Sequence, residues 1–376
     1  MTYNAAGRTY VPGGDDDWER ITPRDAGFDP RGLEAATAFA VAHESTMNRD
    51  IAKALEDGHF SEPPPLGDII GPTAPRGDPS GIILRGGRIV AEWGPTDRAD
   101  MTFSVTKSYL SIMAGLAVDD RIIPDVRRPV GELISDGGFD AEQNRAITWE
   151  HLLHQTSEWE GTLFGKPDLV DRHRRLDLPP GAPSRKGTHR DLQPPGAFWE
   201  YNDVRVNRLS LSLLRALRRP LPEVLRTRIM DPIGASNDWS WHGYLNSWVE
   251  VDSQPMPSVS GGAHWGGGLF IPARDHARIG LLIQRGGLWG DRRLLSEDWV
   301  KACSTPSALN PHYGYLWWLN GDGAHYPSAP TTSFFAMGVG SNVIWIDPAL
   351  DLVVVVRWID KPHVDGFFGR VMEALT

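Results

Sequence analysis

A serine and a lysine three residues apart are the most chemically informative pair in this sequence. They are Ser104 and Lys107, in the segment FSVTKS at 103–108. A serine hydroxyl is a poor nucleophile unless a neighbouring base removes its proton. On a helix, residues at i and i+3 share a face and can touch. A lysine held neutral by burial or a nearby cation can act as that base. The pair therefore predicts a nucleophilic serine with a lysine base.

The plainer interpretation of this spacing is a serine that caps a helix, followed by a solvated lysine. Ser-x-x-Lys also occurs by chance in many proteins. The residues after the motif favour chemistry, because they predict a buried amphipathic helix with apolar side chains at i, i+3 and i+4 spacing: Tyr109, Leu110, Ile112, Met113, Leu116 and Ala117. An exposed lysine would be out of place there. The first N–H groups of such a helix can donate to an oxyanion.

The remaining sequence supplies elements that would hold this helix in place. Helical spacing predicts helices at 31–45, 148–154 and 203–218. Strands are predicted at 81–84, 88–93, 341–347 and 351–359, the first two joined by a tight turn at Gly86-Gly87. Segments 58–80 and 160–198 are predicted loops. A loop as long as 160–198 is uncommon in a compact protein and is often functional.

Strands near both ends with helices between them predict an α+β protein. We expect residues 1–100 and 255–376 to form an α/β lobe that carries the central sheet. Residues 101–254 would form a mainly helical lobe with the nucleophile helix and the 160–198 loop. The two lobes would make one catalytic unit.

Composition narrows the classes of partner. The chain has 376 residues, a formal net charge of -10 and a single cysteine, Cys303. An acidic balance argues against a nucleic-acid or anionic-membrane partner, and one cysteine allows no intrachain disulfide. The N-terminus has no basic stretch followed by an apolar run. We therefore expect a cytoplasmic protein with a small-molecule partner, and a homodimer stays open.

The residues around the serine also resemble a known superfamily. Residues 103–134 (FSVTKSYLSIMAGLAVDDRIIPDVRRPVGELI) and then 146–157 (AITWEHLLHQTS) are similar to serine β-lactamases and penicillin-binding proteins. The resemblance runs from about residue 81 to 359. Within it, the branch of class C β-lactamase-like esterases and amidases that includes the 6-aminohexanoate-dimer hydrolases is the most similar. It implies a β-lactamase/transpeptidase-like fold, an antiparallel sheet flanked by helices plus a helical lobe, with no cofactor.

The resemblance carries a third catalytic residue onto the segment WEYNDV at 199–204. The superfamily has Tyr-x-Asn there, so Tyr201 matches a phenol that relays protons between the serine, the lysine and the leaving group. A core tyrosine is the plainer interpretation. Asp203 replaces the usual Asn. Its carboxylate would either favour an amine-bearing substrate or hold Lys107 charged.

The third block, 335–342, departs most from the superfamily. Gly338 fits the glycine of a Lys-Thr-Gly or His-x-Gly motif, but Ala336 stands where the cation is expected. The resemblance implies that the N–H groups of Ser104 and Val339 form the oxyanion hole. We also expect Gly338 and Asn342 to line the substrate site. The missing cation argues against β-lactam substrates.

Other candidate residues have a structural alternative of similar weight. His264 and Trp265, in a glycine-rich segment, either reach the cleft or form a structural turn. We expect Trp159 to be a cleft wall, and the charged stretches 172–177 and 184–191 to form a solvated face. His151 and His154 match a structural segment of the superfamily. With no HExxH motif or cysteine cluster, we predict no metal.

These observations lead to three hypotheses. The first is a serine hydrolase that cleaves a carboxylic ester or linear amide through an acyl-enzyme on Ser104. The second is a β-lactamase or D-alanyl peptidase with the same machinery. The third is a non-catalytic binding relative that keeps the fold.

Overall fold

The computed structural model describes residues 10–14, 17–60, 62, 65–177 and 184–376. The predicted loops include positions 61, 63–64 and 178–183. The N-terminal segment, which lacks a basic stretch followed by an apolar run, includes positions 1–9 and 15–16. Those positions lie outside the described residues.

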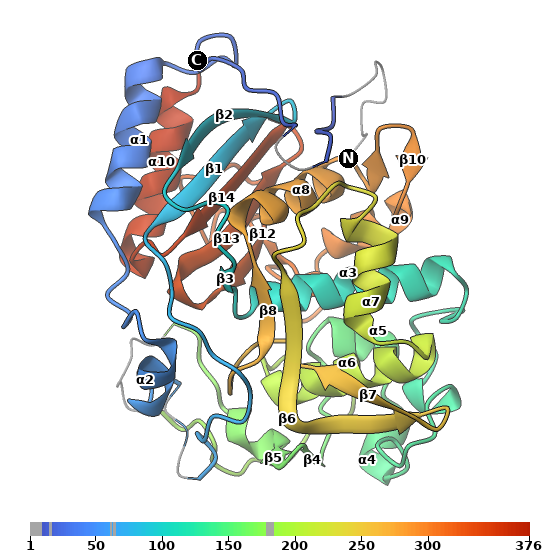
Figure 1. The fold of residues 1–376 in the computed structure, drawn as a ribbon. Helices are drawn as coiled ribbons and strands as arrows, with labels where there is room; N and C mark the ends of the chain where they lie inside the picture. The colour runs from blue at the N-terminus through green and yellow to red at the C-terminus, as the bar shows by residue number, and fades with distance from the viewer. Residues whose placement is uncertain (1–9, 15–16, 61, 63–64, 178–183) are drawn as a thin grey trace.

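An antiparallel sheet of six strands forms the centre of the molecule, in the order β11-β12-β13-β14-β1-β2 (Figure 1). Its strands are β1 (Ser80–Arg85), β2 (Arg88–Trp93), β11 (Trp318–Leu319), β12 (Phe334–Gly338), β13 (Asn342–Asp347) and β14 (Leu352–Arg357). Every residue of β14 is buried, as expected of a strand with neighbours on both sides. The predicted hairpin and the sharing of one sheet by the two ends of the chain are confirmed.

Helices cover both faces of this sheet. Figure 1 shows α1 (Pro30–Ala42) and α10 (Val364–Ala374) side by side on one face. On the other face, α8 (Ala273–Gln284) contacts β14, β13 and β1. The start of α1 is fixed by Asp29, whose carboxylate accepts from the N–H of Gly32 at 2.8 Å. This arrangement buries the sheet between two layers of helices.

The helix after Ser104 connects the sheet to a second group of helices. This helix, α3 (Val105–Asp119), packs against α6 (Asp203–Leu217) and β12. Residues 105–117 of α3 are all buried, so it is a core helix rather than a surface helix with one apolar face. The predicted helices at 148–154 and 203–218 correspond to α5 (Trp149–Leu153) and α6.

A second sheet was not foreseen from the sequence. It has four strands in the order β3-β8-β6-β7: β3 (Asp100–Met101), β8 (Gly268–Ile271), β6 (Ser240–Val251) and β7 (Gln254–Val259). The long strand β6 therefore lies within the part expected to be mainly helical. Its side chains are buried at irregular intervals, so no clean alternation marked it as a strand.

The remaining elements are short. The helices are α2 (Ile51–Glu56), α4 (Glu142–Arg145), α7 (Leu221–Leu225) and α9 (Glu297–Cys303), and the strands are β4 (Thr162–Leu163), β5 (Lys166–Pro167), β9 (Leu288–Trp289) and β10 (Arg292–Arg293). Helical turns are η1 (Val130–Glu132), η2 (Asp168–Asp171), η3 (Arg226–Met230), η4 (Val339–Ser341) and η5 (Lys361–His363). Among the described residues, no helix is both long and apolar enough to cross a membrane.

Candidate active site

Ser104 and Lys107 meet at the start of α3. Ser104 directly precedes the helix with helical backbone angles, and its side chain makes no capping hydrogen bond. Instead, the Lys107 Nζ donates to the Ser104 Oγ at 2.8 Å. The Lys107 side chain is only 1% exposed. This geometry excludes the plainer interpretation of a capping serine and a solvated lysine.

The turn before Ser104 has an unusual backbone conformation. Phe103 has φ of 49°, in the left-handed region that non-glycine residues rarely adopt. Such conformations are costly and cluster at functional sites. Here the turn places Ser104 directly before the first turn of α3, where the positive end of the helix favours negative charge.

The end of β12 passes against this turn. A Cβ on Gly338 would overlap the Thr102 carbonyl and lie 3.1 Å from the backbone N of Ser104. The backbone of Gly338 is extended, so space is the reason for glycine here. Val339 follows at the beginning of η4, and its oxyanion role remains a prediction. Ala336 is fully buried in β12, and its methyl side chain contributes no charge to the site.

A buried carboxylate holds Lys107 from the other side. The Lys107 Nζ lies 2.5 Å from Asp203 Oδ1, at the start of α6. Asp203 Oδ2 also contacts Arg174 and the His264 Nδ1, the latter at 2.9 Å. Burial alone would raise the pKa of Asp203, but Lys107, Arg174 and His264 hold it well below its usual range.

These contacts correct one expectation about Asp203. Of its two interpretations, the structure forms the ion pair with Lys107. The carboxylate is 2% exposed and already has three partners. It therefore offers no charge that would recruit a substrate amine or repel an anionic substrate.

Tyr201 lies beside the lysine but contacts it through its ring. The Lys107 Nζ is 4.6 Å from the ring centroid, and the Arg174 Cζ is 5.2 Å from it. Within the described chain, the Tyr201 hydroxyl makes no hydrogen bond to Lys107 or Ser104. The ring also packs against Trp318, at 5.5 Å between centroids. Proton relay by Tyr201 thus remains a prediction.

Four charged residues at the site were not foreseen as site residues. Asp171 accepts from the N–H of Asp203 at 2.8 Å, and Arg174 contacts both carboxylates. The Lys186 Nζ contacts the carboxylate of Glu62 and lies 3.3 Å from that of Asp171. All four belong to the two long segments predicted as loops. Their only signal was charge density, which does not distinguish burial from solvation.

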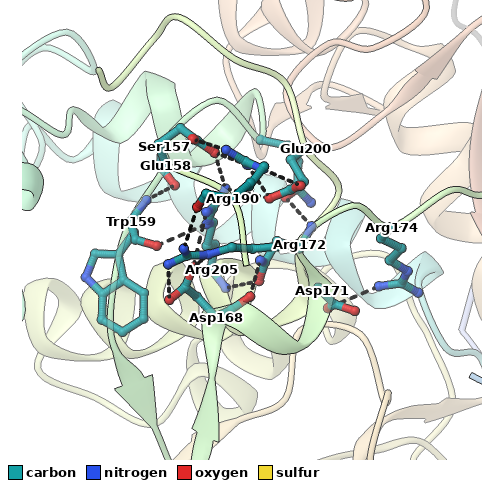
Figure 2. A network of polar contacts seen from close by, with 12 residues as sticks. Ser157, Glu158, Trp159, Asp168, Asp171, Arg172, Arg174, Arg190, Glu200 and Arg205 are labelled. Atoms are coloured by element: carbon teal, nitrogen blue, oxygen red, sulfur yellow. Dashed lines mark hydrogen bonds and ion pairs between the residues drawn. The ribbon is translucent and has the colours of Figure 1, made fainter. Parts of the chain in front are cut away.

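The charged stretches expected to form a solvated face are only partly solvated: residues such as Arg175, Arg185 and His189 are exposed, but four of the basic side chains are folded inward. Figure 2 shows Arg190 between Glu158 and Glu200, with both carboxylates at 2.6 Å. Arg205 of α6 also reaches Glu158, at 2.8 Å. Arg172 pairs with a buried aspartate in η2, Asp168, at 2.9 Å. The pairs of Arg190 with Glu158 and Glu200, and of Arg205 with Glu158 and Asp168, join the 160–198 segment to α6 and to the segments on either side. The solvated-face interpretation is wrong for Arg172, Arg174, Lys186 and Arg190.

Three residues expected at the substrate site lie behind it. Trp159 is 3% exposed and donates to the Gly138 carbonyl at 2.8 Å. Trp265 is 1% exposed and donates to the Leu66 carbonyl at 2.8 Å. Asn342 donates to the Val339 carbonyl at 2.6 Å and accepts from Arg357 at 2.7 Å. Their polar groups are used inside the protein, so these residues support the site rather than line it.

One group of side chains has the composition of a metal site. Glu62, Asp171 and His264 bring ligand atoms within 4.8 Å of one another. The Lys186 ammonium already lies against the two carboxylates, in the position that a cation would take. The donor set therefore suits a lysine better than a metal ion.

The fold and this site define a serine hydrolase of the penicillin-binding and β-lactamase type. The sequence profile of the Beta-lactamase family matches residues 81–364, and the chain belongs to this family. It is 21% identical over 306 residues to the 6-aminohexanoate-dimer hydrolase of Paenarthrobacter ureafaciens. The aligned region covers 73% of this chain and 70% of the relative.

Solved structures share the fold. A family VIII carboxylesterase has a TM-score of 0.58 at 15% identity, covering 92% of this chain and 96% of its own. A putative 6-aminohexanoate-dimer hydrolase from Bacillus anthracis has a TM-score of 0.57 at 14% identity, covering 98% and 89%. A penicillin-binding protein from Bacillus halodurans has a TM-score of 0.53 at 18% identity, covering 79% and 95%. The predicted α+β, β-lactamase/transpeptidase-like fold is confirmed.

Proposed function

We propose that this chain hydrolyses a carboxylic ester or a linear amide through an acyl-enzyme on Ser104. The observation that carries the proposal is the 2.8 Å contact between the Ser104 Oγ and the Lys107 Nζ at the buried start of α3. A serine with an adjacent base in a water-poor site is the arrangement that nucleophilic acyl transfer requires.

The reaction would proceed in two halves. Lys107, in its neutral form, takes the Ser104 proton as the Oγ attacks the substrate carbonyl. The N–H groups of Ser104 and Val339 stabilise the oxyanion. The leaving alcohol or amine receives a proton from Lys107 or Tyr201 and departs, leaving an ester on Ser104. A water molecule then attacks this ester with the same base, releasing the acid and the free serine.

The choice of ester or linear amide over β-lactam rests on charge. Ala336 places no cation on β12, and the cations of the described site each face a carboxylate of the chain itself: Lys107, Arg174 and Lys186. A substrate carboxylate would have to compete with these partners. The similar proteins include a 6-aminohexanoate-dimer hydrolase and a family VIII carboxylesterase by name. The formation of the Ser104–Lys107 contact argues against a non-catalytic relative.

The proposal extends to the setting of the enzyme. We propose a small-molecule substrate, no nucleic-acid or membrane partner, no cofactor and a cytoplasmic location. The acidic net charge of -10 supports the absence of a nucleic-acid or anionic-membrane partner.

Active-site labelling tests the proposal. A fluorophosphonate probe should modify the wild type at Ser104, as located by mass spectrometry, and Ser104→Ala should lose both labelling and turnover. Ser108→Ala is a matched control, because the Ser108 Oγ donates to the Leu316 carbonyl at 2.8 Å and is not at the reacting centre. It should label normally. Turnover of p-nitrophenyl esters, short linear amides and nitrocefin should then be compared. An adduct on another serine, or nitrocefin as the best substrate, would overturn the proposal.

A further inference from the structure

His264 lies between two carboxylates in the interior of the site. Its Nδ1 is 2.9 Å from Asp203 Oδ2, and its Nε2 contacts Glu62 Oε1. The side chain is 1% exposed. The ring stacks on Phe60, with centroids 4.1 Å apart, and packs against Trp265 at 4.3 Å. The orientation of the ring is therefore fixed by contacts on both faces and at both nitrogens.

These contacts determine which protonation state fits. An ionised carboxylate only accepts hydrogen bonds, and a neutral imidazole has a single N–H to donate. Burial alone would raise the pKa of Glu62, but contacts with His264 and Lys186 lower it to about 2. The Lys186 ammonium lies against this carboxylate and favours its ionised form whatever the charge of His264. Asp203 is likewise held ionised by its cationic partners. With both carboxylates charged at neutral pH, only the imidazolium form of His264 satisfies both contacts.

Other charged and titratable groups surround this ring on each side. Burial, and then the charge of His264, lower the pKa of His59, so His59 remains neutral. The groups facing His264 are His59 and Glu62 from the segment after α2, Asp171 of η2, Lys186, and Asp203 with its partners Lys107 and Arg174. With His264 charged, the site contains four cations, His264, Lys186, Arg174 and Lys107, against the three carboxylates of Glu62, Asp171 and Asp203. With His264 neutral, three cations would face three carboxylates, and Lys107 would be one of them.

We infer that His264 is a positioning residue that, as an imidazolium, takes up part of the Asp203 charge and lets Lys107 release its proton at lower pH. The inference rests on the proposed function, because it assumes that Lys107 is the base for Ser104. Without this cation, the Asp203 carboxylate would hold the Lys107 proton more tightly. Two unit charges roughly 6 Å apart at an effective dielectric constant of about 20 change a proton equilibrium by about two pH units.

Glu62→Gln tests the inference while keeping the ring in place. An amide at position 62 can donate to Nε2, so His264 becomes neutral while Nδ1 still donates to Asp203. The rising limb of kcat/KM against pH, measured with p-nitrophenyl acetate, should move up by about one to two units. Activity at pH 7 should fall about tenfold to a hundredfold and recover in alkaline buffer.

His264→Gln should show the same displacement, and His242→Gln is the matched control. His242 Nε2 lies 2.8 Å from Ser240 Oγ, away from the Asp203 carboxylate. Its removal should leave the profile in place. A loss of rate that is equal at every pH in the Glu62 and His264 variants would indicate a structural role and overturn the inference.

A second measurement is independent of catalysis. In protein labelled with ¹⁵N-histidine, the ring nitrogens of His264, assigned by their loss in His264→Gln, should both be protonated from pH 6 to 8. In Glu62→Gln one of them should lose its proton. A neutral His264 in the wild type at pH 7 would overturn the inference even if Ser104 is the nucleophile. Conversely, failure of fluorophosphonate to label Ser104 would remove the proposed function and leave this protonation result intact.

Discussion

The ammonium of Lys107 lies 2.5 Å from the carboxylate of Asp203 and 2.8 Å from the Ser104 hydroxyl. The two contacts act in opposite directions on catalysis. The carboxylate favours the charged lysine, whereas abstraction of the serine proton requires the neutral one. In the proposed mechanism, the relation between Lys107 and Asp203 would therefore set the pH range in which Ser104 can be activated.

Asp203→Asn should make Lys107 a base at lower pH. The amide keeps the size and a hydrogen bond but removes the negative charge that favours the ammonium form. The rising limb of kcat/KM against pH should move down by about one unit or more. This direction is opposite to that expected for Glu62→Gln. Titrating kcat/KM for one ester from pH 5 to 10 checks it, and a limb that stays in place would show that Asp203 does not control Lys107.

The variant carries a stability cost that can be measured separately. Arg174 and His264 also use the Asp203 carboxylate, and breaking a buried ion pair by removing one partner costs about 3–5 kcal/mol. A lower urea midpoint is therefore expected. Activity should be measured well below the unfolding transition, so that a loss of folded protein is not mistaken for a change in protonation.

Lys107→Ala and Tyr201→Phe should each lower kcat by ~10²-fold or more, because positioned proton transfer contributes about that much. If the two residues move the same proton, the double variant should be little slower than the slower single variant. Pre-steady-state and steady-state rates with p-nitrophenyl acetate provide the test. Since the Tyr201 ring, and not its hydroxyl, contacts Lys107 in this structure, near-normal activity in Tyr201→Phe would restrict its role to the cation–π contact.

The sequence was sufficient to place Ser104 and Lys107 at the start of a buried helix and to predict four of the six strands of the central sheet, β1, β2, β13 and β14, but not the second sheet. Ser104 and Lys107 are three residues apart. The apolar 15-residue helix that begins directly after Ser104 and contains Lys107 leaves few alternatives for their placement. Strands flanking a tight glycine turn are equally local signals. These features could be predicted because each depends on residues close together along the chain.

The electrostatic surroundings of the site could not be predicted in this way. Glu62, Arg174 and Lys186 come from aperiodic segments, and their partners are distant in sequence: Lys186 and Glu62 are 124 positions apart, and Arg174 and Asp203 are 29 apart. Charge-rich loops are usually solvated. The expectations that Trp159 forms a cleft wall and that Trp265 reaches the cleft were wrong for a related reason, because a tryptophan's burial is set by tertiary packing and not by its neighbours in sequence.

Cys303 should take no part in catalysis. Burial raises the pKa of its thiol to about 12, so at pH 8 only about one molecule in 10⁴ would carry the reactive thiolate. Iodoacetamide at pH 8 should leave the native enzyme active. Ellman's reagent should detect the thiol only after denaturation. Cys303→Ala should retain turnover, whereas rapid inactivation by iodoacetamide would point to a thiol at the reacting centre.

Stability should decline in mild acid because of buried neutral histidines. Burial lowers the pKa of His154 to about 4, against about 6.5 in an unfolded chain. The unfolded state therefore binds the proton more readily. The stabilisation is complete above pH 6.5 and is lost as pH falls toward 4, amounting to about 1 kcal/mol by pH 5.5. Urea unfolding at pH 7.5 and 5.5 should show this loss in the wild type. His154→Gln should show a smaller loss, and an identical pH dependence in the two proteins would contradict the assignment.

The last prediction concerns the glycine that lies against the Lys107–Asp203 pair. A Cβ on Gly262 would lie 2.5 Å from the Lys107 Nζ and even closer to Asp203 Oδ1. Its backbone is not in the left-handed region, so Gly262→Ala acts through space alone. The methyl group must push the ammonium or the carboxylate aside, and a displacement of about 1 Å at a catalytic group can cost ~10²-fold in rate. Gly321→Ala is the matched control, because a Cβ there would have no atom within 4 Å. We expect fluorophosphonate labelling and ester turnover to fall about a hundredfold in Gly262→Ala and to stay normal in Gly321→Ala, with both proteins folded by circular dichroism. Normal turnover in a folded Gly262→Ala protein would mean that the close contact between Lys107 and Asp203 is not needed for the reaction.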